Sequence, residues 1–156
     1  MATIPKVLHE HIDTAFPANV CLVGTAQPDG FAQISPRGST MVYDAEHLAL
    51  WERGKGSTNA ALKDGAKVTV YLRKPQLREA GILPKGGIAR FYGIARVHKS
   101  GVAYEEVWKR LVQPEKDRDP DKRGSPSSSR SSAPRTWTDS RSPCDALVGH
   151  EGLSHG

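Results

Sequence analysis

The sequence predicts a mainly β protein, an antiparallel barrel of six strands with a few short helices. Two observations predict this class. Short apolar segments with strand-like alternation follow one another across tight turns, as they do in β-hairpins. Most of these segments are not followed by a helix, although a doubly wound parallel sheet would require one after nearly every strand.

The predicted strands are joined mostly by hairpins. The first hairpin closes over residues 27–30, where Pro28 fixes φ and Gly30 accepts a left-handed conformation. Pro36 and Gly38 interrupt its second strand, which indicates a bulge or a sheet edge. The six predicted strands are residues 20–26, 31–35, 39–44, 47–52, 67–72 and 88–99.

Apolar residues at helical spacing predict three helices between these strands. Pro17 ends the first helix, Gly65 the second and Pro114 the third, because neither residue type readily continues a helix. The predicted helices are residues 4–12, 57–63 and 102–112, and residues 77–87 are predicted to form a loop.

The charge of the chain points to an anionic partner. Of 156 residues, 22 are Lys or Arg and 17 are Asp or Glu, which gives a net charge of +5. The excess lies in residues 1–114, because the charges of residues 115–156 cancel. A basic excess suits nucleic acid and a phosphorylated small molecule alike, so composition does not separate these two partners.

Composition also argues against several classes. No apolar run approaches about 18 residues, so we expect no membrane span. The charged N-terminal segment is unlike a secretory signal, so we expect a cytoplasmic location. Cys21 and Cys144 are the only cysteines, which excludes a disulfide framework and a cysteine zinc site. Cys21 lies in an apolar strand and is expected to be an inert core residue.

Residues 48–59 form the most informative segment for function. A strand enters a glycine-broken loop that ends at the predicted N-terminus of the helix at Ser57, where unpaired N–H groups and the helix dipole favour an anion. Arg53 and Lys55 add positive charge, so a phosphate group would fit. The alternative is that Ser57 only caps the helix and that the basic side chains are solvated. The glycine and lysine order of a P-loop is missing.

A second candidate segment, residues 35–39, presents Arg37 beside Gly38, which has no side chain to obstruct a ligand. Taken alone, this segment also fits an ordinary hairpin corner. No catalytic constellation is recognisable, since His9 and His11 point to different faces of their helix. If the protein is an enzyme, its reactive chemistry is expected to belong to a cofactor.

Taken in order, these motifs resemble the pyridoxamine 5'-phosphate oxidase-related FMN-binding split barrels over roughly residues 5–124. The resemblance is carried by the hairpin with its Pro-Asp-Gly turn, the Ser-Pro-Arg-Gly corner, the Leu-Ala-Leu-Trp strand, the Lys-Gly-Ser-Thr-Asn segment, the Phe-Tyr-Gly strand and the helix containing Trp108. It implies a six-stranded split barrel that homodimerises and binds two FMN molecules at the dimer interface. The residues that it implies for the cofactor are Ser35, Pro36, Arg37, Gly38, Ser39, Trp51, Glu52, Arg53, Lys55, Ser57, Thr58 and Asn59.

By this resemblance, the protein is a flavin-dependent oxidoreductase that acts on a small substrate. One alternative is an F420-dependent reductase of the same fold, and another is a non-catalytic flavin-binding protein. A basic barrel that binds nucleic acid is disfavoured, because the aromatic residues form no stacking platform interleaved with Lys and Arg. Family members commonly carry Lys or Arg where Ser57 stands, so the phosphate would depend more on Arg37, Arg53 and Lys55.

The chain departs from the family after residue 124. We divide it into the split barrel, residues 1–124, and a Ser-, Pro- and Arg-rich tail, residues 125–156, which contains nine Ser and few bulky aliphatic residues. The family continues here with an alternating strand, and this composition predicts that the strand is missing. The tail is expected to be disordered, or to be the family's last strand translated out of frame, since a shifted reading with GC-rich codons gives an alternating apolar segment.

Overall fold

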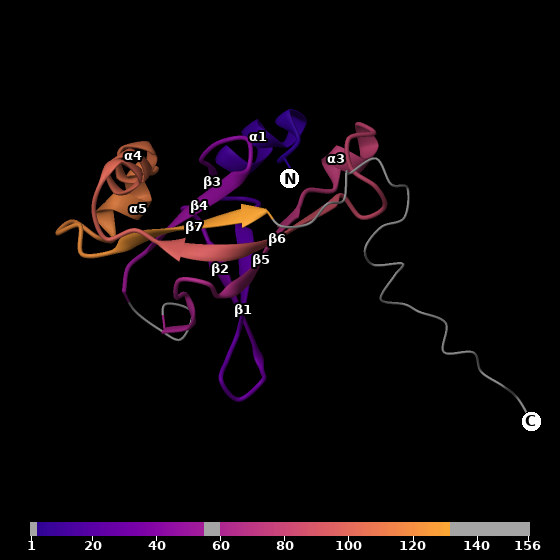
Figure 1. Ribbon diagram of the computed structural model, residues 1–156. Coiled ribbons are helices and arrows are strands. Elements are labelled where there is room, and N and C mark those ends of the chain that lie inside the picture. Colours follow the sequence, from indigo (N-terminus) through magenta and orange to yellow (C-terminus); the bar gives the residue numbers. More distant parts are fainter. Residues whose placement is uncertain (1–2, 55–59, 132–156) are drawn as a thin grey trace, which may run out of the picture.

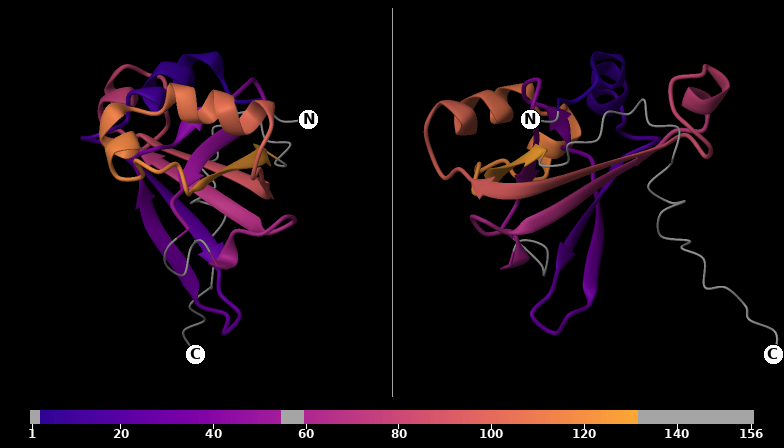
Figure 2. Two further views of the ribbon diagram at one scale, coloured as in Figure 1. Left: turned by 90° about the vertical axis from the view of Figure 1, so that its left-hand side faces the viewer. Right: turned by 45° about the vertical axis from the view of Figure 1, so that its right-hand side comes forward.

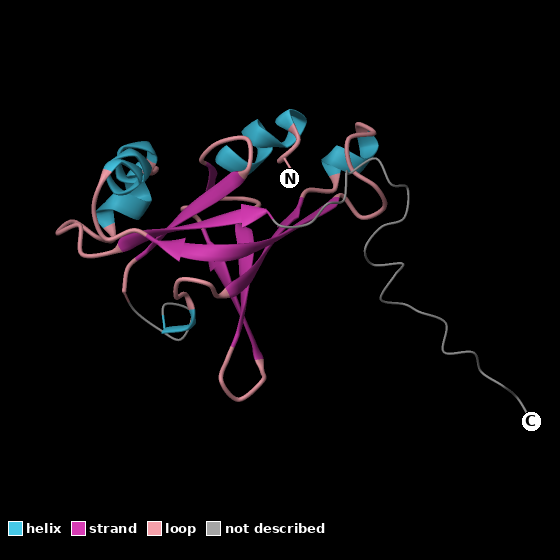
Figure 3. Cartoon of the chain, viewed as in Figure 1, coloured by secondary structure: helices cyan, strands magenta, loops and turns pink. Residues whose placement is uncertain are grey.

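In the computed structural model, which describes residues 3–54 and 60–131, all the strands join one antiparallel sheet that curls into an open barrel (Figures 1 and 3). The strand order in the sheet is β2-β1-β5-β6-β7-β4-β3. The strands are β1 (Cys21–Ala26), β2 (Ala32–Arg37), β3 (Met41–Val42), β4 (His47–Glu52), β5 (Lys67–Arg73), β6 (Ile88–Val97) and β7 (Ser125–Ser131). The helices are α1 (Lys6–Asp13), α3 (Gln76–Glu79), α4 (Val102–Arg110) and α5 (Gln113–Asp117).

Strand β4 separates two hydrophobic cores because both of its faces are covered. Leu48 and Leu50 point into the main core, which fills the barrel beneath α1. Ala49 and Trp51 point the other way, into a smaller cluster beneath α4 that includes Val107. Figure 1 shows α4 and α5 at one end of the sheet and α3 at the other, and the turned views of Figure 2 agree.

The mainly β class and the split-barrel architecture are confirmed. Five of the predicted strands lie close to their predicted positions, and the alternation predicted for residues 88–99 is seen in β6, where Ala89, Phe91 and Ala95 are buried. Strand β2 continues through Pro36 instead of stopping there. Proline is tolerated because β2 is an edge strand, as the sequence had indicated.

The prediction of a missing last strand is wrong. Ser125–Ser131 form β7, which pairs with β4 on one side and with β6 on the other. Backbone hydrogen bonds make this pairing, so it needs no apolar side chains. The sheet therefore has seven strands rather than six. Residues 132–156 lie outside the described residues, and the out-of-frame origin of the tail stays a prediction.

Smaller differences have local causes. The predicted strand 39–44 reduces to the two residues of β3, since Ser39 and Thr40 precede the pairing with β4. The predicted loop 77–87 overlaps the short helix α3. Pro114 does not only end α4 but also stands in the first turn of α5, a position that proline favours. Of the predicted helix 57–63, residues 57–59 lie outside the described residues, and Ala60 and Ala61 are the helical residues among the remaining four.

Candidate anion-binding cleft

A cleft of about 280 Å³ lies where the ends of β2 and β4 meet the segment around α5. Its polar lining consists mainly of charged side chains, three arginines and two glutamates. Apart from these, Phe16 and Val20 contribute from the loop before β1. The cleft is lined by Phe16, Val20, Pro36, Arg37, Gly38, Trp51, Glu52, Arg53, Glu115 and Arg118. Six of the twelve predicted cofactor residues therefore lie together.

The absence of a side chain at Gly38 makes the close packing of this cleft feasible. A Cβ atom at Gly38 would lie 2.7 Å from Phe16 Cδ2 and 2.8 Å from Glu115 Oε1, closer than real Cβ contacts. Gly38 thus lets the Phe16 ring and the Glu115 carboxylate approach the backbone at the end of β2. The sequence singled out this glycine as a place of close approach, but the partners turn out to be protein groups.

Two ion pairs cross the cleft wall. Arg37 donates a hydrogen bond from Nε to Glu52 Oε1, which joins the last residues of β2 and β4. Arg118 donates from Nη1 to Glu115 Oε1 over 2.9 Å. Both glutamates are buried, at about one-twentieth of full exposure. Two of the three cleft arginines are therefore paired with carboxylates.

Arg53 differs from the other two arginines. It directly follows β4 and is exposed, and within residues 3–54 and 60–131 the structure gives its side chain no hydrogen bond and no ion pair. Its charge nevertheless acts on Glu52 and Asp119, where it lowers the pKa values. With Glu52 balancing Arg37 and Glu115 balancing Arg118, the cleft has one positive charge in excess.

Burial raises the pKa of Glu52 above its ordinary value. The Arg37 hydrogen bond and charge and the Arg53 charge oppose this effect, and the Glu115 charge adds to it, so the net shift is upward. Glu52 thus holds a proton more readily than a solvated glutamate does.

The side chain of Trp51 supports the cleft from below. Its ring centroid lies 5.1 Å from that of Tyr104 and 5.0 Å from that of Trp108. Its indole Nε1–H donates to Asp119 Oδ2 over 2.9 Å. Burial raises the pKa of Asp119, but this hydrogen bond, two from backbone N–H groups and the Arg53 charge lower it overall.

Ser39 has a structural contact instead of an open hydroxyl. It is buried, and its Oγ accepts from the Trp51 N–H over 3.0 Å and donates to the Trp51 carbonyl over 3.2 Å. Ser35 lies in the β1–β2 pairing opposite Val23 and does not line the cleft. The remaining predicted residues, Lys55, Ser57, Thr58 and Asn59, lie outside the described residues.

Sequence reasoning missed four residues of the cleft. Phe16 and Val20 lie between α1 and β1, and Glu115 and Arg118 belong to or follow α5. All four lie outside the two motifs, and no local pattern marks them. The balanced charges of residues 115–124 were the only signal in the α5 segment.

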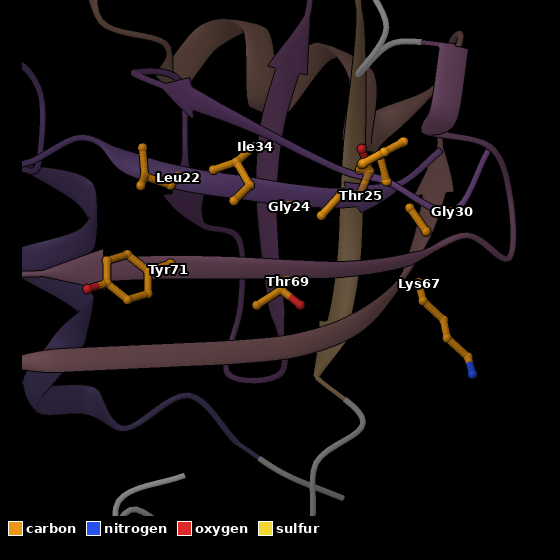
Figure 4. A pocket seen from close by; sticks show the side chains of 11 residues that line it. Leu22, Gly24, Thr25, Gly30, Ile34, Lys67, Thr69 and Tyr71 are labelled. Atoms are coloured by element: carbon orange, nitrogen blue, oxygen red, sulfur yellow. The ribbon is translucent and has the colours of Figure 1, made fainter. Parts of the chain in front are cut away.

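A second, apolar groove of about 620 Å³ lies on the outer face of β1, β2 and β5 (Figure 4). Leu22 and Ile34 lie next to each other on this face, with Gly24 between Thr69 and Ile34 in the close-up. Phe31 is 76% exposed and Ile34 62% exposed. An outer sheet face in water usually carries polar side chains, whereas here Phe31 and Ile34 expose apolar surface.

Other kinds of site find little support in the described part of the chain. Within it, His, Cys, Asp and Glu form no group of three that could hold a metal ion. None of its helices is long and apolar enough to cross a membrane. Cys21 is a free, buried thiol whose pKa is raised to about 12 by burial and by the nearby Asp13 charge.

Comparison with solved structures places this fold among flavoprotein-like split barrels. A protein of Clostridium acetobutylicum related to general stress protein 26, of the pyridoxinephosphate oxidase family, superposes with a TM-score of 0.57 at 15% identity, over 82% of this chain and 86% of that one. An FMN-binding protein of Syntrophomonas wolfei gives 0.53 at 14% identity, over 81% and 84%. An F420 reductase gives 0.57 at 16% identity, over 83% and 97%.

The chain therefore has the fold of the FMN-binding split barrels that are similar to pyridoxamine 5'-phosphate oxidase. No protein-family model matches the sequence, and no curated protein does either. At these identities the likeness shows the fold alone.

Proposed function

We propose that this protein is a flavin-dependent oxidoreductase that binds FMN in the cleft between β2, β4 and α5 and reduces or oxidises a small substrate. The bound flavin would supply the hydride or electron transfer, while the side chains bind and orient it. The observation that carries this proposal is Arg53, an exposed cation that lines a cleft whose other two arginines are paired with carboxylates.

The charges of the cleft fit a phosphate ester. A guanidinium presents a planar fork of N–H donors that matches phosphate oxygens, and Arg53 offers that fork without first giving up a partner in the described structure. Arg37 retains N–H groups besides the Nε that binds Glu52. The split-barrel fold adds support, because an FMN-binding protein shares it.

The test is a flavin titration of the purified protein. We expect a flavin absorbance spectrum or, if the protein is purified without cofactor, quenching of FMN fluorescence with micromolar affinity. Arg53→Gln should weaken FMN binding roughly tenfold, the lower end of the effect of losing a charge-assisted hydrogen bond, because Arg53 is exposed.

Arg78→Gln is the matched control. Arg78 is exposed on α3, at the other end of the sheet (Figure 1), and its loss changes the net charge by the same amount. A protein that binds no FMN would refute the proposal. Equal FMN affinities for the two variants would show that Arg53 is not part of the FMN site.

An F420-dependent reductase is the second candidate, because an F420 reductase shares the fold. F420 also carries phosphate, so the cleft charges do not separate the two cofactors. A competition titration, in which F420 is added to the protein in the presence of FMN, separates them. Displacement of FMN by F420 at concentrations below that of FMN would favour F420, and retention of FMN would favour FMN.

We further propose that the outer groove is the subunit interface of a homodimer. Phe31 and Ile34 expose most of their apolar surface there, and a fully buried aromatic side chain removes about 150–250 Å² from water. A partner subunit could also enlarge the cleft, whose volume lies just below the range of about 300–1,000 Å³ typical of ligand sites. The expected cytoplasmic location stays a prediction.

Sedimentation tests the dimer. Ile34→Asp should shift the protein from dimer to monomer, because the carboxylate would be buried in the apolar interface. Val102→Asp is the control, since Val102 is 80% exposed on α4, away from the groove. A wild-type monomer, or equal masses for both variants, would contradict this interface.

A further inference from the structure

The Arg37–Glu52 ion pair occupies the cleft in which we place the anionic ligand. Glu52 is the last residue of β4 and Arg37 the last residue of β2, so the pair joins the ends of two strands that are not neighbours in the sheet. The Glu52 side chain is 6% exposed and that of Arg37 19% exposed. An anion that binds Arg37 in the cleft would therefore lie next to the buried Glu52 carboxylate.

The groups around Glu52 leave its negative charge weakly supported. Arg37 from β2 and Arg53 after β4 stabilise the charge, whereas Glu115 from α5 repels it. Arg118 is bonded to Glu115, and Asp119 is held by Trp51 and by backbone N–H groups. The ionised form of Glu52 thus depends on the two arginines that an anionic ligand would use.

We infer that binding of a phosphate ester in this cleft is coupled to uptake of one proton by Glu52. The inference rests on the proposed function. When the phosphate shares Arg37 and Arg53, Glu52 loses part of its cationic support and gains a second negative neighbour. The proton comes from solvent and joins the Glu52 carboxylate, which removes the repulsion between the carboxylate and the phosphate.

Two further points agree with this coupling. Burial already raises the pKa of Glu52 in the free protein, so little additional perturbation is needed for protonation. The protonated carboxyl can still accept a hydrogen bond from Arg37 and can also donate one to a phosphate oxygen. Glu52 is thereby a specificity residue, which admits a phosphate ester only together with a proton.

The experiment measures FMN binding by titration calorimetry in two buffers of different ionisation enthalpy, without phosphate, at about pH 7. The dependence of the enthalpy on the buffer gives the protons taken up per FMN. The phosphate of FMN itself titrates near about pH 6, so a repeat at about pH 8, where the free ligand is already ionised, keeps its own proton uptake small. The wild type should take up more protons than Glu52→Gln, by a difference approaching one at full coupling.

The affinities give an independent readout. The ratio of the wild-type FMN affinity to the Glu52→Gln affinity should decrease as the pH is raised. The decrease should be at most about tenfold per pH unit, which is the limit for one linked proton. At alkaline pH, Glu52→Gln should bind FMN more tightly than the wild type because the competing charge is gone. Glu79→Gln, an exposed change of the same charge on α3, should leave both readouts at the wild-type values.

The outcomes separate the two proposals. If FMN binds and the Glu52→Gln variant takes up as many protons as the wild type, the coupling is refuted and the proposed function stands. If FMN binds to neither protein although both are folded by circular dichroism, the proposed function fails and the coupling fails with it. Glutamine has nearly the same shape as glutamate and can accept the Arg37 hydrogen bond, so the variant is expected to fold.

Discussion

Gly124→Ala is expected to destabilise the protein strongly, because Gly124 sits where α5 and Asp119 meet the end of β4. A Cβ atom there would collide with the Glu52 carbonyl oxygen and the Trp51 Nε1, and would lie 2.9 Å from Asp119 Oδ2. Asp119 Oδ2 also accepts the Gly124 N–H over 2.8 Å and the Trp51 indole N–H over 2.9 Å. The added methyl group must therefore separate a buried carboxylate from its donors.

The size of the effect follows from two contributions. Overpacking of a dense site costs about 1–3 kcal/mol. Donors left buried without an acceptor cost about 1–3 kcal/mol more. The total, about 2–6 kcal/mol, is a large part of the roughly 5–15 kcal/mol that separates folded from unfolded states of typical domains. The φ angle of Gly124 is not in the left-handed region, so collision alone decides the result.

Urea unfolding followed by tryptophan fluorescence measures this effect. The midpoint should fall by roughly 1–3 M, given a typical denaturant dependence of about 1–3 kcal/mol per M. Gly24→Ala is the matched control, because a Cβ there lies 3.8 Å from the Thr69 carbonyl oxygen, an ordinary contact. If the two variants unfold at the same urea concentration, the packing described around Gly124 is wrong.

Two other predictions concern titratable groups. In a Cys144→Ser background, Cys21 should resist alkylation by iodoacetamide at about pH 8 until urea unfolds the protein. The reason is that its thiol is buried and has a pKa raised to about 12. Alkylation at the rate of a free cysteine would contradict this prediction. The pKa of Asp119 is lowered from 3.8, so its carboxylate stabilises the folded state at pH values above 3.8, and this stability is lost as the pH falls through the lower pKa of the folded state. The free energy of unfolding of Asp119→Asn should therefore be about 1–3 kcal/mol below that of the wild type at neutral pH and should approach it in acid. Urea midpoints at several pH values measure this difference, and a difference that does not change with pH would refute the assignment.

The two candidate motifs show how far sequence reasoning could reach. Arg37 and Arg53 were predicted from local patterns, a proline-glycine corner and a strand that enters a glycine-broken loop. Glu52 was implied by the family resemblance, and the fold brings all three into one cleft. Their pairing could not be predicted. Whether Arg37 faces solvent or Glu52 depends on how β2 and β4, which are not paired, approach each other across the barrel.

Strand β7 shows the opposite case, in which composition gave a wrong prediction. Ser125–Ser131 lack the alternation that predicts a strand, yet β4 and β6 each offer a row of backbone donors and acceptors that this segment pairs with. Resequencing the gene would test whether the segment is read out of frame. An unshifted template that encodes the present tail would end that hypothesis.

By itself, the sequence determined the mainly β class, the approximate positions of most strands, the buried Cys21 and the two segments that bear Arg37 and Arg53. These properties follow from local rules, since alternation, turn residues and terminators act over a few residues. Only the tertiary structure decided that β7 completes the sheet and that Glu115 and Arg118 close the cleft. It also decided which cleft arginines pair with a carboxylate among residues 3–54 and 60–131, because charge pairing depends on distances between segments that are remote in the chain.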